Sequence, residues 1–189
     1  METAKKENRT KIKAVLTEEG AIVEASEQVN SLKNSGYGTD KNGKLILKPY
    51  ETLFLVDRKV IEVFDKKDKE LDFQDLLQLF KSFDENVWLR YLIYRDLRKR
   101  GYVVREGFGF GIDFRVYERG EYGKNPAKYV VFGIVEGRPV QIGRLASTLE
   151  KVQSLKKKLI LAVVSRRGEI VYYSLSQLAL HEVKENAEV

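Results

Sequence analysis

The chain has 189 residues, of which 43% are hydrophobic and 33% are charged, and its formal net charge is +6. This length fits one large domain or two small ones. Because the chain has no cysteine, a disulfide framework, a thiolate zinc site and a thiol nucleophile are excluded. No apolar run approaches the ~20 residues of a membrane-spanning helix, and the N-terminus has no signal-peptide core. We therefore expect a cytoplasmic protein with an acidic partner and no membrane contact.

The first part of the sequence predicts a small α/β unit. Apolar segments on both sides of Gly20 predict a β-hairpin. Ser26, Pro49 and Asp72 are typical helix-start residues, and apolar residues follow Asp72 at helical spacing. The charged run 65–70 is expected to be a surface turn. The expected elements are strands at 11–16, 21–24 and 45–47, helices at 26–34 and 49–56, and a helix that follows Asp72.

A change of composition at 82–85 predicts a domain boundary, which divides the chain into 1–82 and 83–189. The second domain opens with an amphipathic helix over 85–100, which Gly101 ends. Apolar strands and a further helix follow, so the sequence predicts an α/β (α+β) fold with a mixed sheet flanked by helices. The expected strands are 102–105, 112–117, 128–135, 158–164 and 169–175, and the helix is 144–156.

Basic and aromatic residues alternate between Arg90 and Lys124. This composition is typical of a surface that holds a polyanion and stacks its bases. It fits equally well a core of buried aromatic rings beneath a solvated charged face. Composition alone leaves both interpretations open.

The glycines of Gly107-Phe-Gly-Phe-Gly111 invite comparison with a phosphate-binding loop. Dinucleotide and P-loop sites need a helix N-terminus after the glycines, whereas this segment leads into a strand. We therefore predict a turn with unusual backbone angles and no cofactor. His181, the only histidine, lies in a charged C-terminal segment and is expected to have no catalytic role.

A second candidate is a magnesium-dependent nuclease site formed by Asp113 and Glu136. Such a site needs oxygen ligands that converge on the metal and a lysine near the attacking water. Arg138 stands where the lysine is expected, and arginine does not release its proton. We predict no metal site, and a metal-dependent DNA nuclease remains an alternative.

Four motifs carry a resemblance over residues 84–175: Tyr94-Arg-Asp-Leu-Arg-Lys-Arg-Gly-Tyr102, Asp113-Phe-Arg-Val-Tyr117, Lys157-Lys-Leu-Ile-Leu-Ala-Val-Val164 and Gly168-Glu-Ile-Val-Tyr-Tyr173. With these motifs the chain resembles the archaeal tRNA-splicing endonucleases. The resemblance implies a small N-terminal α/β domain and a C-terminal domain of restriction-endonuclease-like topology. It also implies assembly into four subunits and recognition of a bulge-helix-bulge in precursor tRNA.

The resemblance further implies RNA cleavage without metal by a tyrosine, a histidine and a lysine. In the family, tyrosine takes the proton of the 2′-hydroxyl, histidine protonates the leaving 5′-oxygen, and lysine stabilises charge on the phosphate. The products carry a 2′,3′-cyclic phosphate and a 5′-hydroxyl. Tyr117 matches the tyrosine, and Lys157 matches the lysine by strand register, with Lys151 as the alternative. Pro126 occupies the histidine position and has no side-chain proton to donate.

Two further positions depart from the family. Glu150 replaces an arginine that holds a flipped base, and Ser165-Arg-Arg-Gly-Glu169 replaces an acidic loop that docks into a basic cleft of another subunit. The resemblance, with these departures, implies a structural, non-catalytic subunit of a heterotetrameric endonuclease. We expect it to pair with a catalytic subunit through the edge of its strand at 170–175. The expected RNA contacts are Arg144, Lys156 and Lys158.

Two other functions stay open. One is a self-sufficient splicing endonuclease that has a substitute proton donor. The other is a basic RNA-binding module without an enzyme partner.

Overall fold

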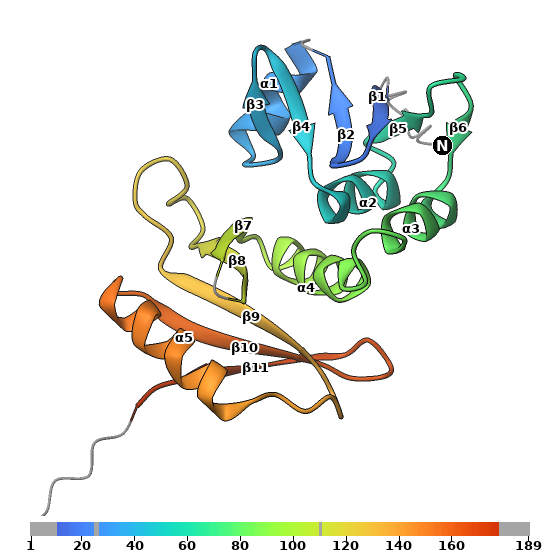
Figure 1. Cartoon of the computed structure of the whole chain (residues 1–189). Coiled ribbons are helices and arrows are strands. Elements are labelled where there is room, and N and C mark those ends of the chain that lie inside the picture. The colour runs from blue at the N-terminus through green and yellow to red at the C-terminus, as the bar shows by residue number, and fades with distance from the viewer. Residues whose placement is uncertain (1–10, 25–26, 110, 178–189) are drawn as a thin grey trace, which may run out of the picture.

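The structure is a computed structural model that describes residues 11–24, 27–109 and 111–177 (Figure 1). Over these residues the chain forms two mixed sheets and five helices, which confirms the predicted α/β class. Two residues discussed above, Ser26 and His181, lie outside the described residues. None of the helices in the described part combines the length and apolar character that crossing a membrane requires.

The first sheet has the strand order β3-β4-β2-β1-β5-β6, and within it β1 and β5 run parallel. The strands are β1 (Ile12–Thr17), β2 (Gly20–Val23), β3 (Thr39–Lys41), β4 (Lys44–Leu47), β5 (Ile61–Phe64) and β6 (Glu70–Leu71). The helices of this half are α1 (Glu27–Asn34), α2 (Pro49–Asp57) and α3 (Phe73–Lys81).

Local signals place several of these elements. The hairpin turns at Gly20, whose φ is +134° and whose missing Cβ would lie 2.0 Å from the carbonyl oxygen of Leu47. Only glycine fits there, because any side chain would collide with the backbone of β4. Helix α2 begins at Pro49, as predicted. Asp72 accepts a 2.8 Å hydrogen bond from the N–H of Asp75 and so caps α3, also as predicted.

The sequence pattern did not predict three strands of this sheet. β3 contains three exposed polar residues, and β6 contains only two residues. β5 alternates buried and half-buried residues but is only four residues long. The predicted turn at 65–70 is present and connects β5 to β6, with the Asp65 carboxylate accepting the N–H groups of Lys67 and Lys69.

The second sheet has the order β11-β10-β9-β8-β7, in which β9 and β10 run parallel. The predicted strands are all present: β7 (Val103–Gly109), β8 (Ile112–Tyr117), β9 (Tyr129–Val135), β10 (Lys158–Val164) and β11 (Ile170–Leu175). β7 continues into the glycine-rich segment as far as Gly109, so the predicted connection to β8 is shorter than expected. The helices of this half are α4 (Val87–Lys99) and α5 (Ile142–Ser154).

Helices α4 and α5 cover opposite faces of the second sheet (Figure 1). On β9, Val131 belongs to the core that includes α4, whereas Val130 and Phe132 belong to the core that includes α5. β9 and β10 are thus buried on both faces, which explains their near-continuous apolar sequences.

Helix α4 also packs against α2. The ring of Tyr94 lies 5.0 Å from that of Tyr50, 5.5 Å from that of Phe54 and 6.0 Å from that of Phe114. One buried core therefore continues from the first sheet through α2 and α4 to the second sheet. The division at 82/83 stays a prediction.

Candidate functional site

The ends of β8, β9 and β10 bring the family-matched positions together at one end of the second sheet. In the strand register, Tyr129 lies beside Val116 on one side and beside Lys158 on the other. Tyr117 follows Val116, and Lys157 precedes Lys158. Because β9 lies between β8 and β10, Tyr117 and Lys157 lie at the same end of the sheet.

Lys157 is linked directly to the segment that holds Pro126. Its Nζ donates a 2.6 Å hydrogen bond to the carbonyl oxygen of Ala127, the residue after Pro126. Ala127 is buried, whereas Pro126 is exposed. The three family-matched positions, tyrosine, proline and lysine, thus border one site, and their chemical roles stay predictions.

The two candidate lysines differ in where the fold puts them. Lys151 lies in the last turn of α5. Lys157 follows α5 in the connection to β10, after Lys156 has taken a left-handed backbone conformation with φ +54°. The hydrogen bond to Ala127 makes Lys157 the better candidate for the matched lysine.

Tyr117 and the residue after it make contacts that the sequence did not predict. The half-buried Tyr117 ring meets the ring of Tyr122 edge-on, with centroids 5.1 Å apart. Glu118 accepts hydrogen bonds from Lys128 Nζ at 2.8 Å and from the Tyr129 hydroxyl at 3.0 Å. The hydrogen bonds from Lys128 and Tyr129 lower the pKa of Glu118, so its carboxylate is ionised at neutral pH.

The three predicted RNA contacts do not lie together. Lys156 and Lys158 flank Lys157 and are exposed. Arg144 lies in the first turn of α5, with its guanidinium 5.5 Å from the centre of the Phe132 ring. Arg144 lines a separate pocket. The helical spacing of α5 could not predict this pocket, because the pocket forms only where α5 packs against β9.

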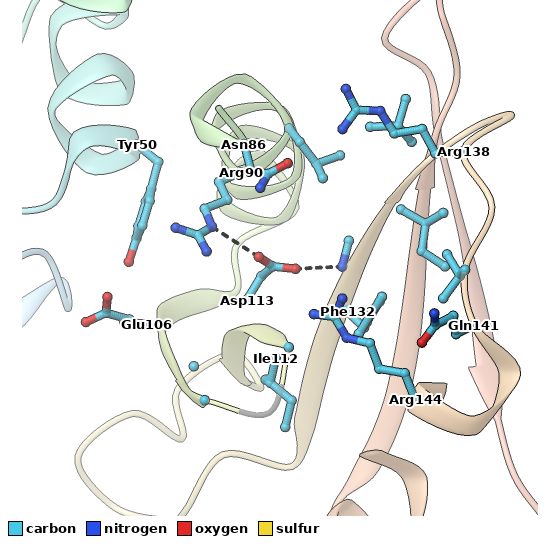
Figure 2. A pocket seen from close by; sticks show the side chains of 18 of the residues that line it. Tyr50, Asn86, Arg90, Glu106, Ile112, Asp113, Phe132, Arg138, Gln141 and Arg144 are labelled. Atoms are coloured by element: carbon cyan, nitrogen blue, oxygen red, sulfur yellow. Dashed lines mark hydrogen bonds and ion pairs between the residues drawn. The ribbon is translucent and has the colours of Figure 1, made fainter. Parts of the chain in front are cut away.

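That pocket has a volume of about 720 Å³ and lies between the two halves of the chain (Figure 2). Tyr50 of α2 lines one side, Arg90 of α4 and Asp113 of β8 lie at the centre, and Arg138 and Arg144 come from the β9–α5 connection and from α5. Glu106 also lines the pocket and pairs with Lys48 at 3.3 Å, so three arginines face two carboxylates. The remaining excess of positive charge favours an acidic ligand.

The predicted metal-nuclease residue Asp113 is engaged by protein groups within this pocket. Its Oδ1 accepts a 3.1 Å hydrogen bond from Arg90 Nε, and its Oδ2 accepts a 2.7 Å hydrogen bond from the N–H of Gly133 (Figure 2). Arg90 also pairs with Asp84 at 3.0 Å. In the part of the chain that the structure describes, no group of three or more residues is arranged to hold a metal ion. Asp113 therefore ties α4 to β9.

Both halves of the chain match models of known protein domains. Residues 12–77 match the family model for the N-terminal domain of the tRNA intron endonuclease, and residues 87–172 match the model for its catalytic C-terminal domain. A tRNA-splicing endonuclease of Methanococcus vannielii is 34% identical over 169 residues, which are 89% of this chain and 96% of that protein.

Two further relatives carry the same name. A tRNA-splicing endonuclease of Pyrococcus furiosus is 32% identical over 168 residues, 88% of this chain and 96% of that protein. One of Methanococcoides burtonii is 32% identical over 177 residues, 92% of this chain but 49% of that longer protein. Because both domain models match and two of these relatives are covered over 96% of their length, the chain belongs to the tRNA intron endonuclease family.

Proposed function

We propose that this chain is the structural, non-catalytic subunit of a heterotetrameric tRNA-splicing endonuclease. The complex would excise introns from precursor tRNA at bulge-helix-bulge sites. One observation carries the proposal. Pro126 stands at the family's histidine position. The carbonyl oxygen of the next residue, Ala127, accepts a 2.6 Å hydrogen bond from Lys157 Nζ. The tyrosine and lysine positions are kept, and the proton donor is missing.

The missing donor matters because the 5′-oxygen leaves poorly without a proton. A positioned general acid contributes about 10²–10⁴-fold to such a step. Glu118, next to Tyr117, is a poor substitute, because its lowered pKa leaves it ionised at neutral pH. The Tyr129 hydroxyl already donates to Glu118. These contacts argue against the alternative of a self-sufficient enzyme with a substitute donor.

We assign the pocket around Asp113 to an acidic loop of the catalytic partner. Asp84 and Asp113 neutralise Arg90. For Arg138 and Arg144 the described residues provide no ion pair, so their charges are open to an anionic ligand. Charge complementarity of this kind selects partners and suppresses wrong ones.

The chain's own loop favours a different partner over a second copy of itself. The β10–β11 turn carries Arg166 and Arg167, both exposed, where the family has acidic residues. A homotetramer would bring these arginines to an arginine-lined pocket, and like charges there are unfavourable. A heterotetramer avoids this conflict.

The second contact with the partner would use β11. It is an edge strand with one neighbour, β10, so the hydrogen-bonding groups on its outer side are available for strand addition. Val171 and Tyr173 on β11 are 51% and 55% exposed. Their strand partners Val163 and Leu161 extend this apolar strip across β10. Covering the strip would add apolar burial to the strand pairing.

The test compares the chain alone with the chain co-expressed with its catalytic partner. Each preparation is mixed with a bulge-helix-bulge RNA in EDTA. We expect cleavage only by the complex, whose native mass should correspond to two copies of each subunit. Tyr117→Phe in this chain should change the rate of the complex little.

Three outcomes would contradict the proposal. Metal-free cleavage by the chain alone would identify a self-sufficient enzyme. Loss of cleavage in EDTA and recovery with Mg²⁺ would favour a metal-dependent nuclease that uses Asp113 and Glu136. Purification as a lone RNA-binding species that forms no complex would favour a simple binding module.

A further inference from the structure

The turn between β10 and β11, residues 165–169, presents two adjacent arginines that take no part in forming it. The N–H of Ser165 donates to the carbonyl oxygen of Glu169 at 2.9 Å, and the N–H of Gly168 donates to that of Ser165 at 2.9 Å. Gly168 takes the left-handed conformation that closes the turn, with φ +79°. Backbone hydrogen bonds thus fix the turn, and the side chains of Arg166 and Arg167 are free for a ligand.

A third arginine lies on the neighbouring turn. The N–H of Glu136 donates a 2.9 Å hydrogen bond to the carbonyl oxygen of Val164, so the turn after β9 lies beside the turn after β10. Arg138 on the first of these turns is exposed, as are Arg166 and Arg167 on the second. We call these three residues the arginine end of the sheet. They outnumber the two glutamates of the same turns, Glu136 and Glu169.

The opposite end of β10 is also cationic. Lys156, Lys157 and Lys158 stand at the start of the strand, beside the Tyr117 site. The residues that follow, Leu-Ile-Leu-Ala-Val-Val, carry no charge. Lys158 and Arg166 are eight residues apart in the sequence. Because a strand rises about 3.3 Å per residue, the two cationic ends lie about 26 Å apart. In Figure 1 the β10–β11 turn and the loop that follows β8 lie at opposite ends of the sheet.

We infer that Arg166 and Arg167 bind the phosphate backbone of the same RNA whose processing site lies at the lysine end. This inference rests on the proposed function, because it extends that RNA across the second sheet. A nucleic-acid strand carries about one phosphate per 3.4 Å of helix axis, so about 26 Å corresponds to roughly eight phosphates. One polyanion can therefore contact both ends, whereas a short acidic protein loop reaches only one. Arginine also suits phosphate, since its planar group donates two parallel hydrogen bonds.

The test measures RNA affinity for Arg166→Glu/Arg167→Glu and for a matched control, Lys66→Glu/Lys67→Glu. The control pair also consists of two exposed, adjacent cations on a turn between strands, in the other sheet. The probe is a bulge-helix-bulge RNA with 2′-deoxy residues at the cleavage sites, which cannot be cut. Binding is measured across a salt series, and the unfolding midpoint of each variant verifies that it is folded.

We expect the arginine variant to bind at least about tenfold more weakly at about 0.1 M salt. The slope of log affinity against log salt should become shallower by about 1.4 to 1.8, the value for two lost phosphate contacts. The control should stay within about twofold of the wild type. Arg166→Lys/Arg167→Lys should keep the wild-type slope, because the two charges remain.

Two results would overturn the inference. An equal loss of affinity in both charge-reversal variants would show a general effect of net charge. Unchanged RNA binding together with loss of the partner complex would show that the turn contacts an acidic face of the partner instead. Cleavage by the chain alone would refute only the proposed role as a structural subunit. The binding assay uses an RNA that cannot be cut, so its result does not depend on which subunit is catalytic.

Discussion

Glu51 and Arg105 form an ion pair inside the contact between α2 and β7, with Glu51 Oε1 3.7 Å from Arg105 Nη1. Glu51 is only 2% exposed. Its carboxylate also accepts the N–H groups of Lys48 at 2.9 Å and Gly38 at 3.1 Å. Arg105 in turn donates to the carbonyl oxygen of Gly36 at 2.9 Å. One buried carboxylate thus joins the first sheet's loops to a strand of the second sheet.

Glu51→Ala should lower the free energy of unfolding by about 3–5 kcal/mol. It removes the partner of two backbone N–H groups and of the half-buried Arg105 guanidinium, whose side chain is 16% exposed. Urea titration followed by circular dichroism measures the change. Glu62→Ala, which breaks the exposed Lys11–Glu62 pair, is the control and should have little effect. Similar losses in both variants would contradict a special role for the buried pair.

The same carboxylate should make stability depend on pH. Burial raises the pKa of Glu51, and the Lys48 N–H and Arg105 only partly offset this. The folded protein therefore binds this proton more tightly than the unfolded chain, whose glutamate titrates near about 4.3. The stabilisation is present at low pH and is lost as pH rises through the raised pKa. The difference in unfolding free energy between wild type and Glu51→Gln should fall over that window, and a flat difference would refute the prediction.

Gly20→Ala should destabilise the protein far more than Gly43→Ala. Both glycines have positive φ, so alanine is strained at either position. At Gly20 the new Cβ would also lie 2.0 Å from the carbonyl oxygen of Leu47, whereas at Gly43 no atom lies within 4 Å. We expect about 1 kcal/mol at Gly43 and several times that at Gly20. Thermal unfolding measures the loss of stability in each variant. An equal loss in both would mean that the hairpin shifts at no cost and so relieves the clash with Leu47.

Pro126→His should give the isolated chain metal-free cleavage of a bulge-helix-bulge RNA. The reason is that, under the proposed assignment, Tyr117 and Lys157 already border the site and only the proton donor is missing. A general acid is worth about 10²–10⁴-fold, so the gain should be visible above the wild-type background. Pro126→His/Tyr117→Phe is the control and should be inactive. A folded single variant without activity would show that more than the donor has been lost.

Arg138→Glu/Arg144→Glu should weaken assembly with the catalytic partner, because it reverses the charge of the pocket around Asp113. Native mass measurement at a series of protein concentrations reports the complex. Lys124→Glu, an exposed residue of the loop after β8, is the control and should assemble normally. If the pocket variant also assembled normally, the acidic-loop assignment would be wrong.

The elements that the sequence predicts well are those with local causes. Gly20, Pro49 and Asp72 each fix a turn or a helix start through their own backbone or side chain. The missed strand β3 has polar, exposed residues and exists because β4 pairs with it. Helical spacing predicts Trp88 on the same side of α4 as the buried Leu92, but Trp88 is 40% exposed and stacks on Tyr91. Helical spacing alone did not show that this position lies at the margin of the buried face.

In the candidate site too, the sequence did not predict features that depend on packing between distant segments. Tyr117 and Lys157 lie at the same end of the sheet because β9 pairs with both β8 and β10. The sequence predicted the mixed sheet but not these pairings. The position of Arg144 depends on the packing of α5 against β9, which no motif encodes. For the aromatic stretch, burial supports the core interpretation in part, and contact of its other rings with RNA stays a prediction. Tyr91, Tyr94 and Phe114 are core residues, whereas Tyr117 and Tyr122 border the site.

The hydrogen bond from Lys157 to the Ala127 carbonyl oxygen gives this lysine a structural use that does not depend on any reaction. A lysine at this position is therefore compatible with a catalytic subunit and with a structural one. The residue that separates the two in a sequence is the proton donor, because Pro126 has no side-chain proton to give.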